Sequence, residues 1–281
     1  MIRKSITFTA GDDFKKLSTF LKKNDISTRI INEIKRSDGL ILNGRPAYTI
    51  DSVKKGDSVT VIFLEEQRIS CDPEDIPIKI IYEDSDLLVV DKPNGIATHP
   101  ASGTGGGTLA NAVTNYFINC GYRIPFRPVS RLDKETSGVI VLVKNKYSHL
   151  VLSKQMMSGQ YKKVYIARAS GLIYEDGEIN RPIGRESEES LKRVCREDGK
   201  PARTIYKVLK TQKDSTLLEL LLKTGRTHQI RVHLESIGHP IIGDPVYGNV
   251  SWERMLLHAA CVEFLHPVTG EKLKFESILD F

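Results

Sequence analysis

The pattern of apolar and polar residues predicts a small structured block at the start of the chain. The segment FKKLSTFLKKN places apolar residues at helical spacing, and Ser27 stands where it would cap a second short helix. Asn43-Gly44 lies between two short apolar runs, which predicts a β-hairpin, and SVTVIFL predicts a strand. We therefore expect residues 1–65 to form a small α/β module.

Residues 66–78 break this pattern and indicate a linker, because they hold two prolines and several charges without any apolar period. From residue 79 onward the predicted strands outnumber the helices. The segments GVIVLVKN and LLHAACVEFLHP indicate buried strands, a hairpin pair is expected around Lys213-Asp214, and KYSHLVLSKQMMSG and THQIRVHLESIG indicate helices. Residues 79–281 therefore predict an α+β domain with a mixed, largely antiparallel sheet.

The balance of charge changes this picture modestly in favour of a nucleic-acid partner. The net charge is +6 and the sequence pI is about 9.0. Lys35 and Arg36 would lie on the polar face of the helix that follows Ser27. A basic face of this kind is also compatible with an ordinary solvated surface.

Composition argues against several other classes of protein. No apolar run approaches the roughly 18 residues of a membrane span, and the N-terminus lacks the apolar region of a signal peptide. We therefore expect a cytoplasmic protein without a membrane partner. The four cysteines are scattered without a CxxC pair, so neither a disulfide framework nor a zinc site is expected.

Two further patterns suggest ligand sites but do not meet their requirements. The glycine-rich segment ASGTGGGTLANAV has Thr108 where a dinucleotide-binding loop needs glycine, so we expect a loop that ends at a helix cap, with RNA backbone contact left open. His228 and His233 are five residues apart, which is about 140° around a helix and unsuited to one metal ion. No metal is expected.

The segment VSRLDKETSGVIVLVKN contains the first candidate for chemistry. Asp133 lies between Arg131 and Lys134, just before a Thr-Ser-Gly turn into a buried strand. Such a turn would place the carboxylate at the rim of the sheet, and the neighbouring cations favour its ionised form. On composition alone, a turn-capping aspartate in a salt bridge is the more common explanation.

Two other segments carry polar residues within apolar surroundings. Tyr165 lies inside the predicted strand KKVYIARASG, where packing is the usual role of a tyrosine and proton transfer in a cleft is the alternative. In THQIRVHLESIG, His228 and Arg231 lie on a polar helix face beside an apolar stripe. An arginine in this place suits a buried carboxylate or a phosphate, although alone it would be read as a surface residue.

Taken together, these motifs resemble a known enzyme family. SRLDKETSG, KKVY and TGRTHQIRVH…GHPIIGDPVYG, together with DKPNGIATHP and LLHAACVEFLHP, resemble the RluA class of RNA pseudouridine synthases over residues 79–281. Ser130 stands where this class often has histidine. The two helices and hairpin over roughly residues 12–63 are similar to the S4 RNA-binding module, which is a common attachment to this class, although DDFKKLSTFL replaces its usual first-helix motif.

The resemblance implies a reaction that isomerises uridine within RNA and needs no cofactor. It assigns Asp133, Tyr165 and Arg231 to catalysis. Asp133 would act at C1′, either by attacking it or by removing a sugar proton, and the sequence leaves both routes open. Arg231 would pair with Asp133, and Tyr165 would stack near the base and assist removal of the C5 proton.

The partner implied by the resemblance is RNA, with large-subunit ribosomal RNA as the first expectation and transfer RNA as the alternative. RNA contacts are expected from Arg131, Arg226 and His228, and from Lys35 and Arg36 in the N-terminal module. We expect a monomer. An RNA N-glycosylase and a non-catalytic RNA-binding assembly protein remain as alternative functions.

Overall fold

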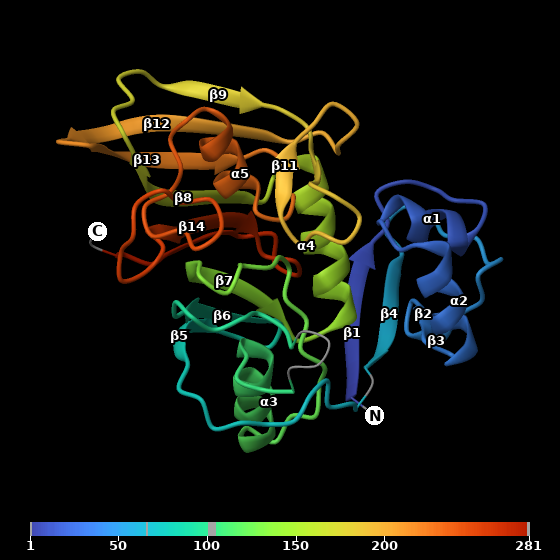
Figure 1. Ribbon diagram of the computed structural model, residues 1–281. Helices are drawn as coiled ribbons and strands as arrows, with labels where there is room; N and C mark the ends of the chain where they lie inside the picture. The colour runs from blue at the N-terminus through green and yellow to red at the C-terminus, as the bar shows by residue number, and fades with distance from the viewer. Residues whose placement is uncertain (1, 66, 101–104, 280–281) are drawn as a thin grey trace.

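The computed structural model describes residues 2–65, 67–100 and 105–279 of the chain. It contains a small sheet near the N-terminus and a large sheet that most of the remaining elements surround (Figure 1). Segment 67–78 connects the two sheets without a helix or strand of its own. None of the helices in the described residues is long and apolar enough to cross a membrane.

The N-terminal sheet pairs strands in the order β1-β4-β2-β3 and is covered by two helices. These elements are β1 (Ile2–Thr9), α1 (Leu17–Lys23), α2 (Thr28–Arg36), β2 (Leu40–Leu42), β3 (Arg45–Pro46) and β4 (Ser58–Glu65). Ser27 caps α2, as predicted, by accepting a hydrogen bond from the backbone N–H of Ile30 at 3.4 Å. Asn43 and Gly44 both have positive φ, as the turn of the predicted hairpin requires.

The large sheet has nine strands. In spatial order they are β5 (Lys79–Glu83), β6 (Leu87–Lys92), β7 (Ser137–Val143), β14 (Leu257–Leu265), β8 (Lys162–Ser170), β13 (Ser215–Leu222), β12 (Arg203–Gln212) and β9 (Gly177–Asn180), with β15 (Lys272–Glu276) beside β14. A separate ribbon pairs β10 (Ile183–Arg185) with β11 (Arg193–Cys195). Among the described strands only β7 and β14 pair in parallel, so the expected mixed, largely antiparallel α+β fold is confirmed.

The middle of the large sheet is buried on both faces. Successive residues of β7 alternate between two apolar clusters, with Ile140 and Leu142 on one face and Val139 and Val141 on the other. The first face packs against α3 (Leu109–Asn119) and α5 (Gln229–Ser236), and the second packs against α4 (Lys146–Ser158). Burial on both sides explains why this strand is apolar without alternation in the sequence.

The N-terminal module is bound firmly to the rest of the chain along α4, which stands between the two sheets (Figure 1). Tyr147 of α4 belongs to the apolar core of the module. Lys4 of β1 forms an ion pair with buried Asp86 at 2.7 Å, and Glu65 of β4 pairs with Arg127 at 2.9 Å. These contacts fix the orientation of the module relative to the large sheet.

Several observed elements were not predicted from the sequence. β9, β10 and β11 are three or four residues long and contain polar side chains, so they carry little periodic signal. β1 and β15 follow an alternating pattern that includes many polar residues. Thr108 caps α3, as predicted, whereas the predicted glycine-rich loop lies partly outside the described residues, at 101–104.

Candidate active site

Asp133 lies in the loop that leads into β7, at the place where β7 meets β14. The pairing of the two strands begins at Ser137 and Gly138. Gly138 has a φ of +112°, and a Cβ added there would lie 2.2 Å from the carbonyl oxygen of Ala259. The glycine of the Thr-Ser-Gly turn therefore allows β7 to approach β14 closely. This close approach sets the position of the preceding loop, which carries Asp133.

The loop is held in place by the segment that follows β6. The Thr98 hydroxyl donates to the carbonyl oxygen of Leu132 at 2.7 Å and accepts from its N–H at 3.2 Å. The fully buried ammonium of Lys92 donates to the carbonyl oxygens of Lys134 at 3.3 Å and Ile96 at 2.7 Å. Burial lowers the pKa of Lys92 to about 8. This segment therefore braces the backbone on both sides of Asp133.

Replacing Thr98 with valine should test this brace without changing the volume of the side chain. Thr98→Val leaves the buried N–H and C=O of Leu132 without partners, and we expect a loss of about 1–3 kcal/mol of unfolding free energy, measured by urea denaturation. The matched control is Thr60→Val, which removes an exposed hydroxyl contact with Thr7. Equal effects of the two substitutions would contradict the role of Thr98.

Arg231 is the centre of the charged network behind Asp133. Its guanidinium is 2% exposed and binds both carboxylate oxygens of Asp244 at 2.7 Å, through Nε and Nη2. Its Nη1 donates to Asp133 at 3.3 Å and lies 3.9 Å from Glu135. The expected contact between Arg231 and Asp133 is therefore present, but the bidentate partner of the arginine is Asp244.

The placement of Arg231 differs from the sequence prediction of a polar helix face. The side chain is buried, because Asp244 compensates its charge inside the protein. Burial raises the pKa of the Asp244 carboxyl, but the hydrogen bonds and charge of Arg231 outweigh this effect and leave that pKa below its ordinary value. Both groups consequently stay ionised, and Arg231 can direct one N–H group at Asp133.

His228 lies beside this network as a neutral imidazole. It precedes α5 rather than lying within the helix, and its φ of +57° is left-handed. Its Nδ1 lies 2.9 Å from the hydroxyl of Tyr247, whose ring packs 5.1 Å from the Arg231 guanidinium. Burial lowers the pKa of His228, so the 3.9 Å approach of its Nε2 to Asp133 is not an ion pair at neutral pH.

Tyr165 comes from β8 in the middle of the large sheet and faces the same space as Asp133. Its side chain is 5% exposed. Burial, with a further contribution from the charge of Asp133, raises the pKa of its phenol. The group is therefore a neutral phenol at neutral pH, which can donate a hydrogen bond and offer a ring face.

One cavity of about 610 Å³ is lined by Asp133, Tyr165 and Arg231 together with other residues of the same loops and strands. Of the residues predicted from the sequence, it brings together Asp133, Tyr165, Arg231, Arg131, Arg226 and His228. Asp133 retains 29% exposure of its side chain, so its carboxylate is open to a ligand. Lys35 and Arg36 do not line this cavity, since they lie at the end of α2 in the N-terminal module.

Sequence reasoning assigned no role to Asp244, Thr98 or Lys92. Asp244 belongs to the segment GHPIIGDPVYG, and the other two lie in DKPNGIATHP. Both segments were recognised as motifs, but nothing local shows that Asp244 binds Arg231 or that Thr98 binds Leu132. Each contact joins elements that meet only in the folded chain.

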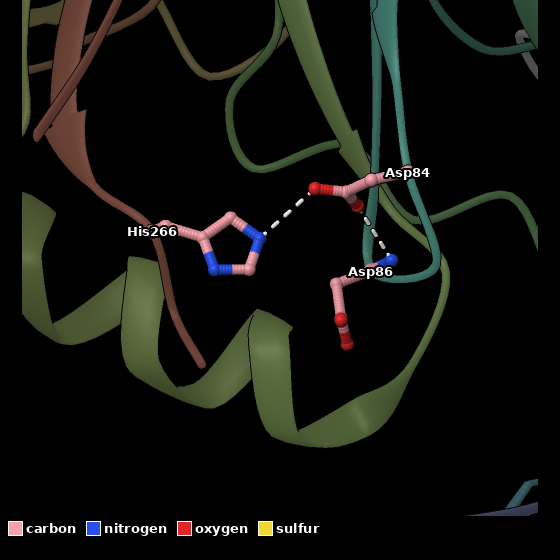
Figure 2. A group of neighbouring side chains, drawn as sticks. All are labelled: Asp84, Asp86 and His266. Carbon is pink, nitrogen blue, oxygen red and sulfur yellow. Dashed lines mark hydrogen bonds and ion pairs between the residues drawn. The ribbon is translucent and has the colours of Figure 1, made fainter. Parts of the chain in front are cut away.

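Asp84, Asp86 and His266 form a separate polar cluster, shown in Figure 2. Their ligand atoms lie within 4.8 Å of one another. His266 Nδ1 accepts from the N–H groups of Val268 and Thr269, so Nε2 carries the hydrogen and donates to Asp84 at 3.0 Å. Asp86 is paired with Lys4. The cluster therefore joins neighbouring turns through hydrogen bonds and an ion pair, and its ligand atoms already have protein partners.

Comparisons with known proteins agree with the motifs gathered at this cavity. A family model described as RNA pseudouridylate synthase matches residues 86–236. The Bacillus subtilis protein named uncharacterized RNA pseudouridine synthase YlyB is 37% identical over 285 residues, covering 98% of this chain and 94% of the relative. The ribosomal large subunit pseudouridine synthase D of Nitrosomonas europaea is 41% identical over 236 residues, covering 80% of this chain and 69% of the relative.

A solved structure extends the agreement to the fold. The human protein RNA pseudouridylate synthase domain containing 1 superposes with a TM-score of 0.61 at 28% identity, covering 73% of this chain and 84% of that protein. The resemblance predicted from the sequence motifs is thereby confirmed. The chain belongs to the RNA pseudouridylate synthase family and is an isomerase that acts on RNA.

Proposed function

We propose that this enzyme converts uridine in large-subunit ribosomal RNA to pseudouridine, using Asp133 at C1′ and no cofactor. The Nitrosomonas europaea relative is named for the ribosomal large subunit, which supports this choice of substrate over transfer RNA. An enzyme that modifies ribosomal RNA works where ribosomes are assembled, so we place it in the cytoplasm.

The reaction can be carried out by protein groups alone because nothing is gained or lost overall. The bond between C1′ and N1 breaks, the uracil turns, and C5 bonds to C1′. The hydrogen at C5 leaves as a proton, and N1 gains one. Asp133 either bonds to C1′ or removes a sugar proton, and both routes require an ionised carboxylate at the sugar.

The observation that carries the proposal is the different exposure of the two partners in one ion pair. Arg231 is buried and held by Asp244, whereas Asp133 is open to the cavity at 3.3 Å from Arg231. The arginine therefore stabilises the charge of the carboxylate from the buried side, and the side of the carboxylate that faces the cavity stays open to the ribose. In this proposal Arg231 is a positioning residue.

Tyr165 and the two exposed arginines complete the proposed site. A neutral phenol in a cavity offers a stacking surface and a hydrogen-bond donor to a uracil that has left its stack. Arg131 and Arg226 are exposed on the cavity lining, where they can contact phosphates of the surrounding strand.

Tritium release from RNA labelled at uridine C5 tests the function and the substrate together. We expect release from a large-subunit ribosomal RNA transcript and not from bulk transfer RNA, without free uracil. Release of free uracil would indicate an N-glycosylase instead. Binding without release from either RNA would favour the non-catalytic RNA-binding function.

The role of the N-terminal module can be tested without disturbing its packing. Lys35→Gln combined with Arg36→Gln removes two exposed charges of α2. We expect weaker RNA binding, an unchanged kcat at saturating substrate, and a salt dependence reduced by about 1.4 in the log-log slope. Lys54→Gln with Lys55→Gln, at an exposed turn of the same module, is the control. Equal affinity of both double variants would contradict an RNA-binding role of α2.

A further inference from the structure

Lys163 is a cation of the cavity to which neither the motifs nor the proposed mechanism assigns a role. It precedes Tyr165 by two residues on β8, so the two side chains lie on the same face of the strand. Both line the cavity that contains Asp133. Lys163 also lines an adjoining cavity of about 90 Å³ under the turn at Lys223-Thr224-Gly225. A Cβ added to Gly225 would lie 3.5 Å from the Lys163 Nζ, which places the ammonium against this turn.

The ammonium of Lys163 has no protein acceptor among the residues that the structure describes. Other buried lysines of the same domain do have acceptors. Lys92 donates to three carbonyl oxygens, and Lys144 binds the Glu83 carboxylate at 2.6 Å. Lys163 is half-buried, and burial lowers its pKa without any opposing carboxylate. A partly desolvated ammonium with three free donors is unfavourable until an anion arrives.

The charges around the cavity favour an anionic ligand at this position. Asp133 is the carboxylate among the lining residues, and Arg231 already pairs with it. Arg131 and Arg226 are exposed, whereas Lys163 lies deeper, next to buried Tyr165. An anion that binds Lys163 within this cavity therefore lies next to the group that contacts Tyr165. In RNA, the anion nearest to a base is the phosphate of its own or the neighbouring nucleotide.

We propose that Lys163 binds an RNA phosphate inside the active-site cavity, adjacent to the nucleotide whose base contacts Tyr165. This inference rests on the proposed function. The phosphate supplies the acceptor that the described residues do not, and it holds the flipped nucleotide at a fixed depth relative to Asp133. Because Gly225 has no side chain, it leaves room beside the ammonium for the phosphate.

The test compares Lys163→Gln, Lys163→Arg and a control, Lys207→Gln, whose exposed side chain on β12 lines neither cavity. Tritium release from a C5-labelled large-subunit transcript gives kcat and KM for each protein. Lys163→Gln should raise KM about tenfold and leave kcat within about twofold, since one charge-assisted hydrogen bond is lost. Lys163→Arg should restore most of the affinity, and Lys207→Gln should match wild type.

Binding measurements make the inference independent of turnover. In an Asp133→Asn background, adding Lys163→Gln should weaken binding of the same transcript and lower the log-log salt slope by about 0.7. If the wild-type protein releases no tritium, the proposed function fails, yet this comparison still tests Lys163. An unchanged affinity and slope would overturn the inference. So would a loss of kcat that arginine does not restore and that alters the pH profile, because Lys163 would then transfer a proton.

A second measurement needs no variant and covers the case in which Lys163→Gln does not fold. Single phosphates of the transcript are replaced by uncharged methylphosphonates around the modified uridine. Wild-type protein should lose about tenfold in affinity at one position directly beside that uridine. Uniform tolerance of the replacements next to the uridine would overturn the proposed contact.

Discussion

Asp133→Asn should abolish tritium release from C5-labelled RNA, with a loss of at least about a thousandfold in kcat. The amide can neither bond to C1′ as a carboxylate does nor remove a sugar proton. The fold should remain, because Arg231 keeps its bidentate contact with Asp244, and Asp133 is partly exposed. Urea denaturation and RNA affinity should therefore both stay close to those of the wild-type protein.

Glu135→Gln is the matched control for this substitution. Glu135 belongs to the same loop and lies 3.9 Å from the same guanidinium, but it does not line the cavity. We expect it to retain turnover within about tenfold, because only the charge near Arg231 changes. An active Asp133→Asn enzyme would refute the assignment of Asp133. An equally inactive Glu135→Gln enzyme would show that the charge of the loop, and not the carboxylate at C1′, limits the reaction.

Asp244→Ala should cause the largest loss of stability. It leaves the fully buried guanidinium of Arg231 without its main partner, and breaking a buried pair in this way costs about 3–5 kcal/mol of unfolding free energy. Turnover should fall as well, since Asp244 holds the guanidinium that directs one N–H group at Asp133. Urea denaturation and tritium release measure the two effects.

A surface pair of the same geometry provides the comparison. Arg203 binds Glu178 through Nε and Nη2 at 2.8 and 2.7 Å, but both side chains are exposed. Glu178→Ala should therefore cost less than about 1 kcal/mol. If Asp244→Ala proved equally mild, the network behind Asp133 would not depend on burial.

The same pair predicts how stability depends on pH. Because the folded-state pKa of Asp244 lies below its ordinary value, its contribution is complete above the unfolded-state pKa near 3.8 and is lost as pH falls through the folded-state value. The unfolding free energy of the wild-type protein should therefore decline below about pH 4. Asp244→Ala should show a shallower decline over that range. An identical acid dependence would mean that other carboxylates determine it.

The sequence predicted those elements whose signal is local. The turns at Asn43-Gly44 and Lys213-Asp214, the cap at Ser27 and the apolar strand β7 all follow from neighbouring residues. The short strands β9 to β11 could not be predicted in this way, because their pairing partners stabilise them rather than their own composition.

In the candidate site, too, residues within local motifs were predicted, whereas contacts between distant segments were not. Asp133, Tyr165 and Arg231 were named because their motifs match a family, and the fold gathers them at one cavity. The partnership of Arg231 with Asp244 was not predicted, since it depends on how the loop after α5 folds back over the helix. That Lys163 has no acceptor within the described part of the chain could not be predicted either, because a lysine beside an apolar strand usually indicates a solvated strand end.

The position of β14 determines when this enzyme can become active during its synthesis. β14 lies between β7, which follows Asp133, and β8, which carries Tyr165. Its residues, 257–265, are made more than a hundred residues after β7, so the two halves of the sheet remain unjoined until β14 has been made. A nascent chain therefore cannot modify RNA on the ribosome that is making it until this strand has emerged and inserted. Until then, the exposed edges of β7 and β8 are open to mispairing, which makes the late strand a point where chaperones would matter.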